Sequence, residues 1–136
     1  MGIVMYAVSD EYNSIAQELL ELPEFDDIRP FASFIVLASS EAKKSNKRIV
    51  FGQCSRVSEL YKWCCPYDFI ILIYEPNIDY FTHNQLKTLI RHELHHIGYD
   101  ATKNEPEPYL VPHDVEEFNI IIKECGLHWE ELSKGE

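Results

Sequence analysis

Residues 82–98, THNQLKTLIRHELHHIG, decide the fold of this 136-residue chain. Thr82 is followed three residues later by Gln85, which is the capping-box pattern of a helix N-terminus, and Gly98 stands where a glycine commonly ends a helix. Between these signals, leucine and isoleucine recur at helical spacing. The sequence therefore predicts a helix from about His83 to Ile97.

A helical wheel places a carboxylate inside the apolar stripe of this helix. With Leu86 at 0° and about 100° per residue, Glu93 lies at about 340°, and His92 and His96 line the edge of the stripe at about 240° and 280°. A buried carboxylate without a partner is costly, so the pattern indicates a compensating group such as a metal-bound water. The side chains that face away from the stripe are those of Lys87, Arg91 and His95.

The segment HELHH, residues 92–96, matches the pattern H-E-x-x-H. Residues four apart in a helix lie one turn apart on the same face, so the imidazoles of His92 and His96 can converge on one cation. In metalloproteases with this pattern the histidines bind zinc and the glutamate, here Glu93, is the general base. The pattern thus predicts a zinc site on this helix.

A simpler interpretation of the same residues stays open. The histidines can be surface residues of an amphipathic helix, with Glu93 paired to Lys87 or Arg91. For His95 the simpler interpretation is preferred, because its side chain points away from the two proposed ligands.

A zinc site with two histidines needs a third protein ligand, which leaves the fourth position for water. The candidates lie near the start of a second predicted helix, where Asp114 and Glu117 repeat the capping-box pattern. His113 is the preferred ligand, because Asp114 is explained as the N-cap and Glu117 as its capping-box partner. Glu116 or Glu117 as a carboxylate ligand is the alternative.

Three further segments predict elements that precede the HELHH helix. Apolar residues at helical spacing over residues 10–21, with the N-cap candidates Ser9 and Asp10, predict an N-terminal helix that ends before Pro23. Phe31–Leu37 and Arg48–Val57 are apolar and β-branched, and we expect them to form a β-hairpin around a polar loop. The nearly continuous apolar run Tyr67–Tyr74 predicts a central strand covered on both faces.

Two elements are predicted after the HELHH helix. A polar stretch of about fifteen residues with three prolines follows Gly98, and irregular loops of that length are usually functional or disordered. A C-terminal helix is then predicted from Asp114 to just before Gly126. With these elements the 136 residues fit one domain, 1–136.

The formal net charge of −11 argues against a nucleic-acid partner or an anionic membrane. The only basic cluster, residues 43–48, is interpreted as a solvated hairpin tip. Residues 1–8 lack the features of a secretory signal, and no run is long enough to span a membrane. The four cysteines lack zinc-finger spacing and are expected to be reduced thiols, so we expect a cytoplasmic protein.

Four segments of the chain resemble the putative phage metallopeptidase family, a compact zincin-like group of phages and prophages. The resemblance spans roughly residues 30–130, and its most specific parts are HELHH and HDVEEF. It implies an α+β, minimal zincin-like fold in which a three- to four-stranded sheet packs on the active-site helix, with helices at both ends of the chain. The segments are YDFIILIYEP (67–76), LIRHELHHIG (89–98), PHDVEEF (112–118) and IIKECGLHW (121–129).

The resemblance also implies that His92 and His96 bind metal, that Glu93 is catalytic, and that His113 completes the site with Asp114 nearby. The expected reaction is peptide-bond hydrolysis in which Glu93 takes a proton from a zinc-activated water and passes it to the leaving amine.

Two further features of this reaction are open. An oxyanion donor is required, for which Tyr99 and Tyr109 are candidates, although both are more simply packing or loop residues. An edge strand of the sheet is a candidate for holding the substrate backbone by strand addition.

A rival hypothesis belongs to another class of function. It describes a catalytically silent, zinc-stabilised phage protein that binds and modulates a host protein, for which an acidic surface suits a basic partner. The presence of Glu93 favours the peptidase, because a purely structural zinc site does not need it. The expected partner is therefore a protein or peptide substrate inside the bacterial host.

Overall fold

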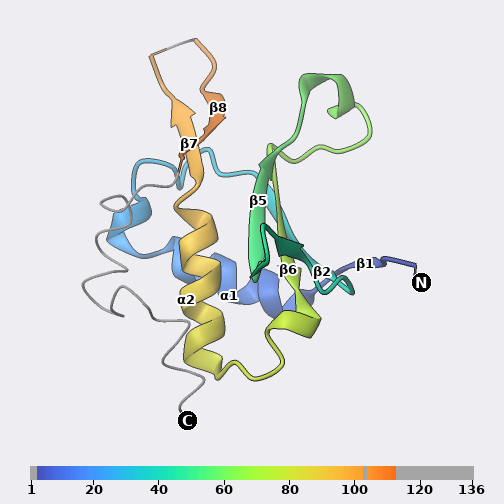
Figure 1. Cartoon of the computed structure of the whole chain (residues 1–136). Coiled ribbons are helices and arrows are strands. Elements are labelled where there is room, and N and C mark those ends of the chain that lie inside the picture. Colours follow the sequence, from blue (N-terminus) through green and yellow to red (C-terminus); the bar gives the residue numbers. More distant parts are fainter. Residues whose placement is uncertain (1–2, 103, 113–136) are drawn as a thin grey trace.

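A continuous apolar run lies at the centre of the sheet as strand β6 (Phe69–Tyr74). The computed structural model describes residues 3–102 and 104–112 of the chain. Within these ranges β6 has a hydrogen-bonded neighbour on each side, in a four-stranded sheet of order β1-β2-β6-β5 (Figure 1). One face of β6 is fully buried and the other is largely half-buried. The prediction of a central strand is confirmed.

The hairpin predicted from Phe31–Leu37 and Arg48–Val57 is wrong. Both segments contain strands, β2 (Phe34–Ser39) and β5 (Gly52–Arg56), but β6 lies between them. β2 pairs with β6 in parallel, whereas β5 pairs with it antiparallel. This arrangement satisfies the backbone hydrogen bonds of the most apolar strand on both of its edges. The sheet is therefore mixed, and β5 is one of its edge strands.

The other edge of the sheet and the basic cluster are formed by short strands. β1 (Tyr6–Val8) pairs antiparallel with β2. β3 (Lys44–Ser45) and β4 (Arg48–Ile49) pair antiparallel around Asn46 and Lys47, whose φ angles of 50° and 66° suit a tight hairpin turn. Residues 44–49 are exposed, so the predicted solvated hairpin tip is confirmed.

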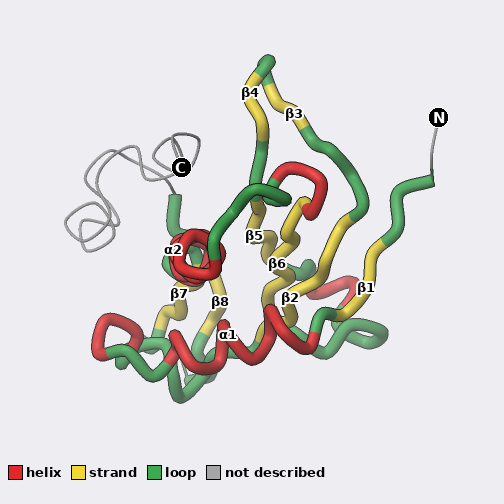
Figure 2. Tube along the Cα trace, turned by 90° about the horizontal axis from the view of Figure 1, so that it is seen from below, coloured by secondary structure: helices red, strands yellow, loops and turns green. Residues whose placement is uncertain are grey.

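Two helices pack against the sheet, and both begin at the predicted caps. α1 (Asp10–Leu20) starts after Ser9, whose hydroxyl accepts from the backbone N–H of Tyr12. α2 (His83–Leu94) starts after Thr82 with both bonds of the capping box. α1 contacts α2 and β2, and α2 contacts β5, as the view along α2 in Figure 2 shows.

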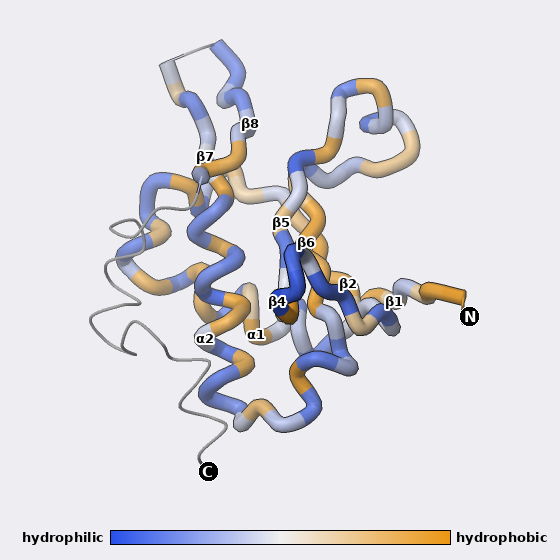
Figure 3. Tube along the Cα trace, in the orientation of Figure 1, coloured by the Kyte–Doolittle hydropathy of each residue, from blue (hydrophilic) through white to orange (hydrophobic). Residues whose placement is uncertain are grey.

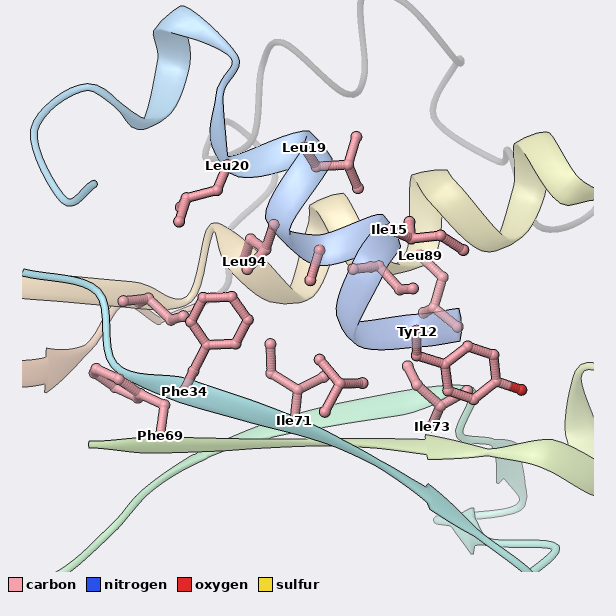
Figure 4. Packing of buried hydrophobic residues seen from close by; sticks show 14 of the residues in the cluster. Tyr12, Ile15, Leu19, Leu20, Phe34, Phe69, Ile71, Ile73, Leu89 and Leu94 are labelled. Atoms are coloured by element: carbon pink, nitrogen blue, oxygen red, sulfur yellow. The ribbon is translucent and has the colours of Figure 1, made fainter. Parts of the chain in front are cut away.

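The core fills the space between these helices and the sheet. Figure 3 shows the apolar character of β6, and Figure 4 shows side chains of the two helices pointing toward the strands. Aliphatic and aromatic side chains form most of this layer, and their burial is the main favourable term in folding. The core residues labelled in Figure 4 are Tyr12, Ile15, Leu19, Leu20, Phe34, Phe69, Ile71, Ile73, Leu89 and Leu94.

α2 ends at Leu94, not at Ile97 as predicted. His95 caps it, and Ile97–Asp100 continues as strand β7, which pairs antiparallel with β8 (Glu107–Leu110). Most of the stretch predicted as an irregular loop is therefore a hairpin. Gly98 does not end the helix but lies in β7 under the ring of Tyr109, where a Cβ atom would lie 2.6 Å from the Tyr109 Cζ.

Some predictions fall outside the described residues. These are the helix expected from Asp114 to just before Gly126, and with it His113 and Glu117. None of the helices within 3–102 and 104–112 has the length and apolar character needed to span a bilayer. Cys54, Cys64 and Cys65 are free thiols.

Gly98→Ala should destabilise the protein by about 1–3 kcal/mol, because the added methyl overlaps the Tyr109 ring. Urea unfolding of the metal-free protein measures this loss. In a Tyr109→Ala background the same substitution should cost much less. An equal cost in both backgrounds would show that Gly98 is required by its backbone instead.

Candidate active site

Glu93 is a buried carboxylate on the side of α2 that faces β5. The residue is 4% exposed, and none of the described residues forms a hydrogen bond or an ion pair with it. Burial raises the pKa of its carboxyl from 4.5 to about 8. The prediction that this carboxylate lies within the apolar stripe is confirmed. A buried polar group in this state calls for a partner.

The two histidines of the motif lie next to each other beside this carboxylate. The ring centroids of His92 and His96 are 5.3 Å apart and the rings are inclined by 79°. His92 is half-buried and His96 is buried. The structure thus brings together the two imidazoles that the sequence predicts as ligands.

His96 follows the last regular residue of α2, so other contacts hold it. Its Nδ1–H donates to the carbonyl oxygen of Val111 at 2.7 Å, and the Val111 N–H donates back to the His96 carbonyl at 2.8 Å. A carbonyl only accepts, so the first bond requires the proton on Nδ1. In the neutral ring the lone pair then lies on Nε2, the nitrogen available for a metal ion.

The side chains of Glu93 and His96 line a pocket of about 400 Å³ between β5 and the end of β8. Cys54 lines it, and burial together with the nearby Glu93 raises the pKa of its thiol. A protonated thiol is a poor nucleophile, so Cys54 is not expected to be the reactive group of this pocket. The lining residues are Gly52, Gln53, Cys54, Glu93, His96, Leu110, Val111 and Pro112.

Gly52 is a site residue that the sequence analysis missed. A Cβ atom there would lie 3.3 Å from Oε2 of Glu93 and 3.2 Å from the carbonyl oxygen of Leu72. The absent side chain leaves the space that the buried carboxylate occupies. A glycine inside a strand pattern often marks such a close approach, and this was the available signal.

The two tyrosines proposed as oxyanion donors lie beside a neighbouring pocket of about 850 Å³, which shares Leu110 with the first. The Tyr99 hydroxyl donates to Asp68 at 2.8 Å and accepts from the N–H of Ser33 at 3.1 Å. The Tyr109 ring packs over Gly98. These contacts give both rings a structural role.

The helical wheel did not predict that the side of α2 opposite the apolar stripe is also covered. Arg91, predicted to face away from the protein, is 9% exposed because the short 3-10 helix η1 (Pro23–Phe25) covers that side. Arg91 and His95 both bind the carboxylate of Glu24. The alternative in which Arg91 pairs with Glu93 is not seen among the described residues.

The described part of the site fits a metal ion only in part. Two imidazoles lie next to each other near a buried carboxylate, but residues 3–102 and 104–112 contain no group of three or more His, Cys, Asp or Glu that could hold a metal. A metal ion bound by these two imidazoles would need at least one further donor. The described chain ends at Pro112 in the pocket wall, directly before His113. His113, Asp114, Glu116 and Glu117 all lie outside the described residues.

The raised pKa of Glu93 makes the stability of the metal-free protein depend on pH. The folded chain holds this proton more tightly than the unfolded chain, so the contribution is full below pH 4.5 and is lost as the pH rises to about 8. Glu93→Gln cannot lose a proton there. Relative to the wild type, its free energy of unfolding in chelator should rise by a few kcal/mol between about pH 5 and about pH 9. Parallel stability curves over this range would contradict the assignment.

Comparison with known proteins assigns the chain to a family. The family described as "Putative phage metallopeptidase" matches residues 4–135, nearly the whole sequence. No curated protein and no solved structure matches the chain. The match includes the HELHH segment, the pocket described above and the residues that follow Pro112. The chain therefore belongs to the putative phage metallopeptidase family.

Proposed function

We propose that the chain is a zinc-dependent peptidase with a minimal zincin-like fold, in which Glu93 is the general base. The observation that carries the proposal is the buried carboxylate of Glu93, which has no partner among the described residues and lines a pocket together with His96. A protein that needed only a stable helix would place a leucine at this position. The cost of burying the carboxylate is offset if it acts on a group bound in the pocket.

In this proposal His92 and His96 bind the zinc ion, and His113 is the third protein ligand. Chain connectivity supports His113. The preceding residue, Pro112, lines the pocket, and adjacent Cα atoms are about 3.8 Å apart. The hydrogen bonds between His96 and Val111 tie this part of the chain to the second ligand. Glu117 is the alternative third ligand, and Asp114 is proposed to support the site.

These residues would hold a zinc ion, which would act as a Lewis acid and would lower the pKa of a water bound to it toward about 7. Glu93 would take a proton from the water whose oxygen bonds to the carbonyl carbon, and would deliver that proton to the amine nitrogen as the C–N bond breaks. Gly52 leaves room for this carboxylate, and Val111 fixes the tautomer of His96.

The substrate is proposed to be a protein or peptide that binds along β5. β5 is the last strand of the sheet, and its residues 52–54 form one wall of the pocket. An extended peptide that added to this edge would bring a peptide bond past Glu93 and His96. We place this activity in the cytoplasm of a phage-infected bacterium.

The decisive experiment compares metal content and cleavage in matched variants. The native protein should contain one equivalent of zinc, which His92→Ala loses and His113→Ala reduces. Glu93→Gln should keep the zinc but lose at least about a hundredfold in the rate of casein cleavage. Zinc measured by mass spectrometry and proteolysis by gel analysis give the two readouts.

Three results would contradict parts of this proposal. Normal zinc binding by His113→Ala together with loss in Glu117→Ala would make the carboxylate the third ligand. Full zinc content without cleavage by the wild type would favour the rival hypothesis of a zinc-stabilised binding protein. A protein without zinc would exclude both functions.

Gly52→Ala should lower the cleavage rate by about tenfold with unchanged zinc content, because the added methyl displaces the carboxylate of Glu93. Ser55→Ala is the control, since strand alternation places residue 55 on the opposite face of β5. Kinetics with one peptide substrate measure the effect. A wild-type rate for Gly52→Ala would show that the carboxylate does not need this space.

A further inference from the structure

The second proposed ligand lies where the helix no longer fixes its direction. α2 ends at Leu94 and His95 is its C-cap, so His96 lacks the regular hydrogen bonds that hold His92. Helix ends fray, and one free turn would let the two imidazoles separate. The spacing of four residues is therefore insufficient by itself. The hydrogen bonds between His96 and Val111 hold one end of this turn, and the contacts of Arg91 and His95 hold the rest.

One carboxylate binds the residues that precede the two ligands. Glu24 accepts from Nε of Arg91 at 3.1 Å, and its other oxygen binds the Arg91 Nη2. The oxygen that accepts from Arg91 Nε also binds Nε2 of His95. The Glu24 side chain is only 7% exposed, and those of Arg91 and His95 are 11% and 17% exposed. These contacts are thus largely shielded from water, where ionic hydrogen bonds are strong.

The position of these contacts controls rotation about the helix axis. Residues 91 and 95 are one turn apart, about 6 Å along the axis, and each is about 100° from the ligand that follows it. A single contact would allow the last turn to pivot. Two contacts to one carboxylate, one turn apart, oppose both rotation and unwinding.

Phe25, the residue after Glu24, also contacts His95. Phe25 is 2% exposed in the core, and its ring lies 4.6 Å from the ring of His95. η1 therefore offers a charged contact and an apolar contact to the C-cap residue of α2. Because the Phe25 side chain is buried in the core, the backbone of the adjacent Glu24 is held in place.

We propose that Glu24 is a positioning residue of the metal site, which holds Arg91 and His95 together and thereby keeps the imidazole rings of His92 and His96 next to each other. This inference rests on the proposed function, because it takes the two histidines as ligands. It also explains the other basic residues of the segment RHELHH. Arg91 and His95 are the anchor, and the histidines that follow them are the ligands.

A set of variants at this anchor separates positioning from general stability. Glu24→Gln keeps the shape of the side chain but removes the negative charge that binds Arg91 and His95. The double variant Glu24→Met/Arg91→Met removes both charges, and replacing a whole buried pair by apolar residues commonly restores stability. Asp26→Asn is the matched control, because it breaks an exposed ion pair with Arg29 on the same segment. Thermal unfolding monitors the stability of the wild type and of all three variants.

Two readouts follow the site itself. In the metal-free protein, ¹⁵N-detected imidazole signals report the Nδ1–H tautomer of His96 that its bond to Val111 requires. Zinc affinity is measured by competition with a chromophoric chelator. Glu24→Gln and the double variant should lose the tautomer preference and bind zinc about tenfold more weakly, even where the double variant is as stable as the wild type. Asp26→Asn should match the wild type in both readouts.

Unchanged His96 signals in Glu24→Gln and the double variant would overturn the inference, whether or not the protein binds zinc. A wild-type zinc affinity in the double variant would also overturn it, because the anchor would then matter only for stability. A wild type that binds no zinc would refute the proposed function, and the imidazole signals would still decide whether Glu24 positions His96.

Discussion

A carboxylate buried between α2 and β5 is the constraint on which the rest of the structure depends. Glu93 occupies a position in the apolar stripe of the helix that packing alone would give to leucine. The strand opposite must then lack a side chain at Gly52, and it must be an edge strand if the pocket is to stay open. The sheet order, with β6 inside and β5 at the edge, meets the second condition, and Gly52 in β5 meets the first.

Elements that depend on local patterns were predictable from the sequence, and elements that depend on distant partners were not. The caps at Ser9 and Thr82 and the apolar run of β6 each carry their signal within a few residues. The pairing of β2 with β6 brings together segments far apart in the chain, and a hairpin between β2 and β5 fits the local pattern equally well. The end of α2 was missed for the same reason, because Gly98 is explained by Tyr109 in another strand.

In the candidate site, too, features set by local sequence were predictable and features set by distant residues were not. The burial of Glu93 and the proximity of His92 and His96 follow from helical spacing, and the structure confirms them. A wheel assumes that one side of a helix is covered, whereas η1 covers a second side, so the partner of Arg91 and His95 was not foreseen. The roles of His113, Asp114 and Glu117 stay predictions, because those residues lie outside the described ranges.

The two ends of the β7–β8 hairpin differ in how they relate to His96. Its base is fixed, since the pair Ile97 and Leu110 lies next to the bonds between His96 and Val111. Its far end, beyond Asp100 and Glu107, carries no part of that arrangement. Insertions or deletions at the tip therefore change the neighbouring wall without moving the imidazole at the base. The shape of the pocket wall can thus change with the length of this loop independently of the position of His96.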